Sequence, residues 1–71
     1  MNREQMTENE ASIYVYAARY AHDRNTAAAY QVVKEILHVW DSLPERIQNQ
    51  LKREAKKATY NRNDWQRLID R

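Results

Sequence analysis

The chain contains no glycine, and this absence constrains its fold more than any other feature of its 71 residues. Glycine provides the positive φ angles of tight hairpins and lets the backbone approach phosphate groups closely. Tight β-hairpins, phosphate-binding loops and dinucleotide-binding fingerprints are therefore not expected. No alternating run of apolar and polar residues predicts a strand either. The pattern favours helices joined by turns that capping residues make.

Cysteine is also absent, which excludes disulfides, thiolate nucleophiles and iron–sulfur clusters. The two histidines, His22 and His38, belong to no metal-binding pattern, and we interpret both as surface residues. The two serines, Ser12 and Ser42, lie in no nucleophile motif. We therefore predict a protein that is not an enzyme and that binds no metal or cofactor. Because no apolar run is long enough to cross a membrane, we expect a cytoplasmic protein without membrane contact.

Residues 8–71 are predicted to form one domain, after a disordered segment over residues 1–7. The domain is expected to be all-α, a small bundle of three main helices and a short C-terminal helix. The first helix is predicted over residues 8–24, because Thr7 and Glu10 have the spacing of a capping box. At helical spacing, its expected core face carries Ile13, Ala17, Tyr20, Ala21 and Arg24.

The second helix is predicted over residues 27–42, after the capping residues Asn25 and Thr26. Its apolar arc spans about 160° at 100° per residue, which favours a central position in the bundle. The arc consists of Ala29, Val32, Val33, Ile36, Leu37, Val39, Trp40 and Leu43.

The third helix is predicted to begin at the Ser42-Leu43-Pro44-Glu45 run and to reach residue 59. Ser42 would be its N-cap, Glu45 the capping-box partner, and Pro44 would stand in the first turn. A short last helix, capped by Asn61 or Asn63, would follow. The apolar residues expected inside from these two helices are Ile47, Leu51, Ala55, Ala58, Trp65, Leu68 and Ile69, and Trp40 is expected in the core with Trp65.

Basic residues are concentrated in residues 44–71, which carry eight basic and four acidic side chains. On the third helix they form one face, made of Arg46, Arg53, Lys56, Lys57 and Tyr60. Such a face attracts nucleic-acid phosphates, and Tyr60 offers a ring on which a base can stack. The same pattern is also that of a solvated face with cations near a helix C-terminus. Nucleic-acid binding is therefore the alternative function.

Tyrosine and arginine gather around the end of the first helix. The cluster consists of Tyr16, Arg19, Tyr20, Arg24 and Tyr30. These residue types are enriched in interface hot spots, which favours a surface that binds a partner protein. Alternatively, the tyrosines complete a thin core, Arg24 binds a local carbonyl, and Arg19 pairs with Asp23. A further alternative is a small-nucleotide sponge, with Arg19 and Arg24 of two subunits around a phosphate. The short chain favours a homo-oligomer, since small cores need additional stabilisation.

One part of the sequence resembles a known family. The residues that carry the resemblance are the run Arg19-Tyr20-Ala21-His22-Asp23-Arg24-Asn25-Thr26, followed by Val32-Val33, Trp40-Asp41-Ser42-Leu43-Pro44, Arg53-Glu54 and Asp64-Trp65. In these residues the chain resembles small proteins encoded by bacteriophages and prophages. They show R-Y-A-x-x-R-x-T, a hydrophobic helix ending in W-x-x-L, and an amphipathic helix. The resemblance covers residues 13–69, and the chain departs from the pattern at His22-Asp23, where the family has a hydrophobic–glycine pair.

The family has no established activity, so the resemblance implies a phage or prophage accessory context in a bacterial host. Together with the tyrosine–arginine cluster, it leads to a functional hypothesis. The chain is predicted to be a non-enzymatic binding protein that acts stoichiometrically on a host or phage protein.

Overall fold

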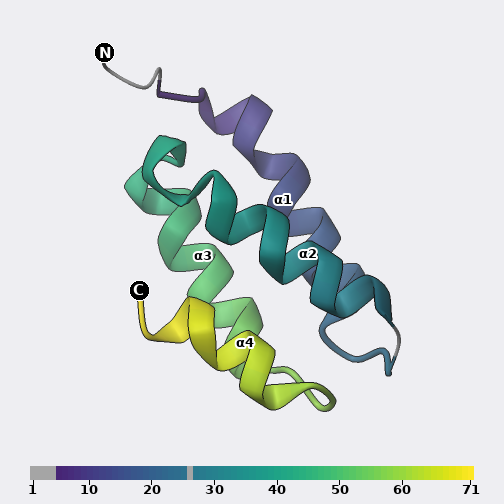
Figure 1. The fold of residues 1–71 in the computed structure, drawn as a ribbon. Coiled ribbons are helices and arrows are strands. Elements are labelled where there is room, and N and C mark those ends of the chain that lie inside the picture. The colour runs from purple at the N-terminus through teal and green to yellow at the C-terminus, as the bar shows by residue number, and fades with distance from the viewer. Residues whose placement is uncertain (1–4, 26) are drawn as a thin grey trace.

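The computed structural model describes residues 5–25 and 27–71, and every regular element in these ranges is a helix (Figure 1). The elements are α1 (Glu8–Ala21), α2 (Ala27–His38), a short 3₁₀ helix η1 (Trp40–Ser42), α3 (Glu45–Lys56) and α4 (Arg62–Ile69). The predicted all-α bundle of three longer helices and a short C-terminal one is therefore confirmed.

The four helices close into a ring. α1 packs against α2 and α3, and α4 packs against the same two helices (Figure 1). Each helix thus has two principal neighbours, and the prediction that the second helix is central is wrong. Its apolar arc is only partly enclosed: Val33 and Ile36 are fully buried, whereas Val32, Leu37 and Val39 are partly buried at its sides.

α1 and α3 run in the same direction along their contact. Glu8 pairs with Arg46, Arg19 pairs with Glu54, and the carbonyl of His22 accepts a hydrogen bond from the N–H of Thr59. The sequence offsets of these pairs are 38, 35 and 37 residues, so α1 and α3 keep a nearly constant register along their whole length.

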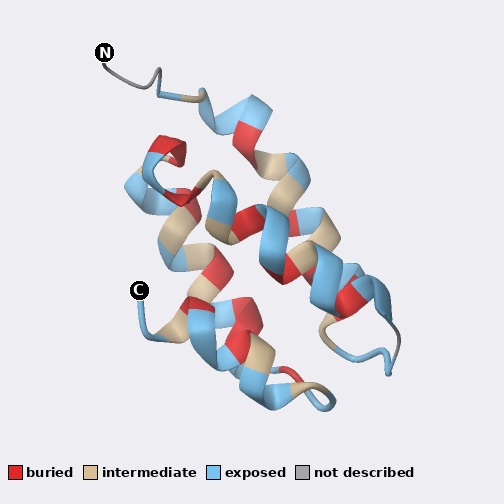
Figure 2. Ribbon diagram, viewed as in Figure 1, coloured by how far each residue is buried: buried red, intermediate tan, exposed pale blue. Residues whose placement is uncertain are grey.

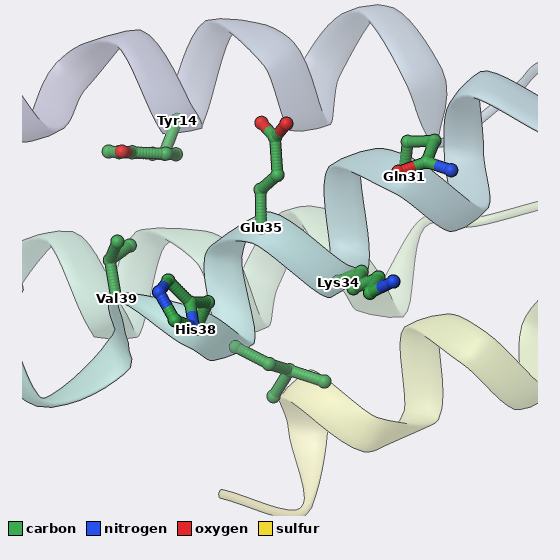
Figure 3. A pocket seen from close by; sticks show the side chains of 7 residues that line it. Tyr14, Gln31, Lys34, Glu35, His38 and Val39 are labelled. Atoms are coloured by element: carbon green, nitrogen blue, oxygen red, sulfur yellow. The ribbon is translucent and has the colours of Figure 1, made fainter.

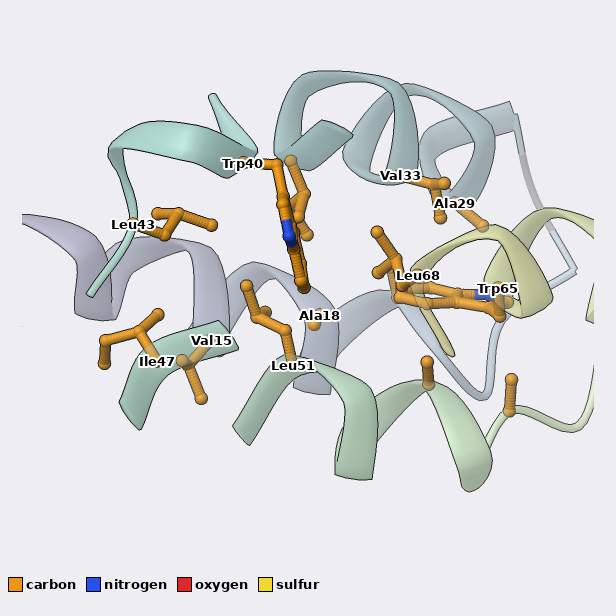
Figure 4. Packing of buried hydrophobic residues seen from close by; sticks show 14 of the residues in the cluster. Val15, Ala18, Ala29, Val33, Trp40, Leu43, Ile47, Leu51, Trp65 and Leu68 are labelled. Atoms are coloured by element: carbon orange, nitrogen blue, oxygen red, sulfur yellow. The ribbon is translucent and has the colours of Figure 1, made fainter. Parts of the chain in front are cut away.

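The core lies inside the ring and receives side chains from all four helices and from η1 (Figures 2 and 4). Both tryptophans are buried, as the sequence predicts, and Figure 4 shows them in different parts of the core. Trp40 stands beside Leu43 and Leu51, whereas Trp65 lies with Leu68 next to α2. The inward residues predicted for the third and fourth helices are also buried, apart from Ile69, which is partly buried.

The buried side of α1 shares only Ala21 with the predicted core face. It consists of Ala11, Val15, Ala18 and Ala21, whereas Ile13 and Tyr20 are each 60% exposed. The prediction is wrong at Ile13 and Tyr20, two large side chains that the helical spacing placed on the core face. Small side chains on the inner side let α1 approach its neighbours, whose Trp40, Leu51 and Ile47 fill the space between the helices.

The start of α1 forms as predicted. The Thr7 hydroxyl accepts from the N–H of Glu10, and the Glu10 carboxylate accepts from the N–H of Thr7, which completes the capping box. Residues 1–4 of the expected disordered segment, and the expected cap Thr26, lie outside the described residues. Within the segment, the N–H of Met6 donates to the carbonyl of Ser42 at 2.9 Å, and its side chain packs against the core.

The predicted cap of the third helix is wrong. Ser42 is the last residue of η1 and is buried, while Pro44 occupies the N-cap position of α3 without a side-chain cap. A residue before proline avoids the helical region, and Leu43 is accordingly extended, with φ −82° and ψ 136°. Two extended residues therefore separate Ser42 from α3. The second helix ends at His38 and not at residue 42, because residues 40–42 form η1.

The turn between α3 and α4 depends on Asn61. Asn61 has a left-handed backbone, with φ 57° and ψ 39°, which asparagine tolerates better than most residues. It occupies the N-cap position of α4 as predicted, but its side chain does not cap the helix. The side-chain amide donates instead to the carbonyl of Arg24, at 3.4 Å, and so connects this turn to the end of α1.

Candidate binding surfaces on α1 and α3

The outward side of α1 carries three large apolar side chains. Ile13, Tyr16 and Tyr20 are exposed by 60%, 65% and 60%. They are three and four residues apart, so they form one stripe along the helix, opposite its alanine-rich buried side. We call this stripe, together with Arg19 and Arg24, the α1 face. It holds four of the five residues that the sequence predicts to bind a partner.

Each tyrosine of the α1 face has an arginine over its ring. The guanidinium carbon of Arg19 lies 5.9 Å from the centroid of the Tyr16 ring, and that of Arg24 lies 4.1 Å from the centroid of the Tyr20 ring. Arg24 Nε also donates to the carbonyl of Tyr20 at 2.9 Å. These contacts hold both side chains of the Arg24–Tyr20 pair in one arrangement on the surface.

Tyr30 stands apart from this face. It is exposed on α2, five residues before Glu35, which corresponds to about 140° around the helix at 3.6 residues per turn. Figure 3 shows Glu35 pointing toward α1. Tyr30 therefore lies on the side of α2 turned away from α1, and the fifth residue of the predicted cluster is not brought to the other four.

Arg19 also belongs to a cluster of charges between α1 and α3. Arg19 Nε lies 3.4 Å from Oε2 of Glu54, and Lys57 Nζ lies 3.5 Å from the same oxygen. His22 Nε2 lies 3.4 Å from the other oxygen, Oε1. The carboxylate that Arg19 contacts is thus that of Glu54, 35 residues away, and not that of Asp23.

Glu54 is the buried member of this cluster. Its side chain is 8% exposed, whereas those of Arg19 and Lys57 are 51% and 63% exposed. His22 was expected at the surface, but its side chain is only 17% exposed and faces Glu54. Within the part of the chain that the structure describes, His22 Nδ1 is buried without a hydrogen-bond partner. The sequence pattern missed this cluster, since its members come from two helices.

The basic face of α3 is exposed along its whole length, as the sequence predicts for Arg46, Arg53, Lys56, Lys57 and Tyr60. Arg46 pairs with Glu8 at 3.6 Å, and Lys57 pairs with Glu54. Arg53 and Lys56 form no ion pair with any described residue. The charges of these two side chains are therefore balanced by no ion pair within the described residues.

An open hollow of about 690 Å³ lies over the outer side of α2 (Figure 3). It is lined by Tyr14, Gln31, Lys34, Glu35, Leu37, His38 and Val39. Tyr14 comes from α1, and the other six come from α2 and the residue after it. The lining mixes apolar and charged side chains and includes no residue of the α1 face or of the basic face of α3.

The capping box of α1 shifts the titration of Glu10. Hydrogen bonds from the backbone N–H and the side chain of Thr7 lower the pKa of Glu10 below its usual value of 4.5. This effect belongs to the capping box of α1. Among residues 5–25 and 27–71, no group of three histidines or acidic residues is placed to hold a metal ion.

No described helix is long and apolar enough to span a membrane. No family model, curated protein or solved structure matches the chain. The geometry therefore defines the class only as a small all-α protein with an aromatic face on one helix and a basic face on its neighbour.

Proposed function

We propose that this chain is a non-enzymatic protein-binding module and that its contact surface is the α1 face. The observation that carries the proposal is the exposure of Ile13, Tyr16 and Tyr20 in one line, with an arginine over each tyrosine ring. Tyrosine and arginine are enriched among the few residues that dominate the binding energy of protein interfaces. Large apolar side chains aligned on one helix are suited to a groove or a helix on another protein.

The arrangement of the arginines supports the same proposal. Arg19 is held by Glu54, and Arg24 is held by the carbonyl and the ring of Tyr20. Ordering a free side chain on binding costs about 0.5–1.5 kcal/mol, and side chains that are already held lose less. The α1 face therefore presents two rigid aromatic contacts and two charged groups at a reduced entropic cost.

The proposal extends to context and assembly. The chain is a phage or prophage accessory factor that acts stoichiometrically on a host protein, as a homo-oligomer. The resemblance of residues 19–26 to small phage-encoded proteins supports the context, and the length of 71 residues supports assembly. A measured mass in solution tests the assembly directly, and a monomeric mass at all concentrations would contradict it.

The binding surface is tested by affinity capture from a bacterial host lysate with quantified partners. Tyr20→Ala is compared with Tyr30→Ala, the same substitution at an exposed tyrosine away from the α1 face. Truncating a hot-spot residue costs about 2 kcal/mol or more, so we expect Tyr20→Ala to reduce capture at least about ten-fold. Tyr30→Ala should capture as the native chain does. Equal capture by both variants, or equal loss, would refute the assignment of the α1 face.

A further inference from the structure

The parallel contact between α1 and α3 joins two surfaces that lie 30 to 40 residues apart in the sequence. Arg19 of α1 and Lys57 of α3 approach the same oxygen of Glu54, at 3.4 and 3.5 Å. With an offset of about 36 residues between the helices, Tyr16 lies at the level of Arg53. The seam between α1 and α3 is therefore one continuous surface, which neither helix forms alone.

The charges along this seam do not balance. One buried carboxylate, that of Glu54, contacts two basic side chains that are each more than half exposed. Arg53 and Lys56 lie about 40° and 100° around α3 from Lys57, toward its outward side, and add two more positive charges, which no described carboxylate pairs. Four basic residues and one acidic residue give the seam a formal charge of +3. Since the whole chain carries +2, the remainder carries −1.

Two exposed aromatic rings border the same seam. Tyr16 lies on the α1 side, with Arg19 over its ring. Tyr60, which is 49% exposed, follows Lys57 by three residues. The hydrogen bond from Thr59 N–H to the carbonyl of His22 holds this turn against the end of α1. Basic groups and two exposed aromatic rings thus occur along the same seam.

From this arrangement we infer that the α1–α3 seam binds single-stranded nucleic acid. Its residues are Tyr16, Arg19, Arg53, Lys56, Lys57 and Tyr60. The four cations contact backbone phosphates, and the two tyrosines stack on unpaired bases, which every base permits because each has a π-face. This activity goes beyond the proposed protein binding, and it does not require Tyr20 or Ile13.

The chemistry favours a single strand over a duplex or an acidic protein. Stacking on tyrosine requires a base that is not already stacked between neighbours, and a duplex offers such bases only at its ends. An acidic peptide would use the cations but would not need an aromatic ring on each side. The modest charge of +3 predicts weak binding that weakens further as the salt concentration rises.

The test is fluorescence anisotropy of the full chain with a labelled single-stranded thymidine oligonucleotide of about 15 nucleotides, titrated over a range of salt concentrations. Each phosphate contact to a single strand contributes about 0.7 to the slope of log K against log salt. Lys56→Ala should therefore lower the slope by about 0.7 and the affinity about five-fold at ~0.1 M salt. Its matched control is Lys34→Ala, the same change at the hollow over α2, which should bind as the native chain does.

Two further variants separate stacking from charge. Tyr60→Ala should weaken binding about five-fold or more without changing the salt slope, because it removes a ring and no charge. Glu54→Gln should raise the affinity about five-fold and steepen the slope, because Arg19 and Lys57 lose the carboxylate that they share. If Glu54→Gln does not fold, the comparison of Lys56→Ala with Lys34→Ala still tests the inference.

Several results would overturn the inference. They are no binding at the lowest salt, equal binding by Lys56→Ala and Lys34→Ala, and equal binding by Tyr60→Ala and the native chain. Equal affinity for a blunt duplex of the same length would mean that the surface contacts phosphates without stacking on bases. Equal affinity for poly-glutamate would assign it to an acidic protein partner.

Discussion

Two alanine substitutions on α1, two residues apart, test the packing of this helix. Val15 is 4% exposed and lies in the core, whereas Ile13 is 60% exposed on the α1 face. Isoleucine is the larger side chain, so a prediction from hydrophobicity alone makes Ile13→Ala the more damaging change. The structure predicts the opposite order.

The magnitudes follow from burial. Val15→Ala removes two buried methyl groups, worth about 0.8 kcal/mol each, and leaves a small cavity that adds to this cost. Alanine has a better helix propensity than valine, which stabilises the variant by about 0.5 kcal/mol. The expected net loss in the free energy of unfolding is therefore about 2 kcal/mol. For Ile13→Ala most of the removed surface is already in water, and the expected change is within about 0.5 kcal/mol.

Thermal unfolding followed by far-ultraviolet circular dichroism measures both effects. In a domain of this size, 1 kcal/mol shifts the Tm by about 4–8 °C, so Val15→Ala should lower it by about 8–16 °C and Ile13→Ala by less than about 4 °C. The measurement is repeated over a range of protein concentrations, because self-association makes the Tm depend on concentration. A loss for Ile13→Ala that equals or exceeds that for Val15→Ala at every concentration would refute the assigned buried side of α1.

Three other changes have defined outcomes. Since the pKa of Glu10 is lowered in the fold, its contribution to stability is present above pH 4.5 and is lost as the pH falls through the lowered value. The protection of the first-turn amides of α1 against exchange, relative to unstructured peptides at the same pH, should therefore fall in acid, and Glu10→Gln should remove this pH dependence. Asn61→Ala should cost about 1 kcal/mol in urea unfolding, whereas Asn61→Gly should cost less, because only glycine adopts φ 57° freely. Leu51→Ala should cost about 3–5 kcal/mol, and a loss below about 1 kcal/mol would contradict its complete burial.

The parts of the fold that could be predicted from the sequence depend on local interactions. The capping box of Thr7 and Glu10 involves residues three apart, and its geometry is the same in any helix. The inward positions of α3, such as Ile47 and Leu51, follow from spacing because that helix has a narrow apolar side between charged residues. Trp65 was correctly placed in the core because α4 offers few other large apolar side chains to bury.

The parts that could not be predicted depend on which elements become neighbours. Alanine is compatible with either side of a helix, so Ala11 and Ala18 do not reveal in the sequence that they face the core. Their burial follows from the large side chains that α3 and η1 supply opposite them. Serine is a common helix cap, but Leu43 is extended because it precedes proline. The start of α3 therefore lies too far along the chain for the Ser42 side chain to cap it.

Glu54 shows most clearly why the candidate site could not be read from one helix. It is the only acidic residue between positions 46 and 62, and spacing within α3 relates it to Lys57 alone. Its contacts with Arg19 and His22 exist only because α1 lies parallel to α3. The same carboxylate holds the two helices together and balances part of the positive charge of the seam. Removing its charge should therefore lower the Tm and raise the affinity for a single strand. A structural ion pair without a binding role would change only the first of these quantities.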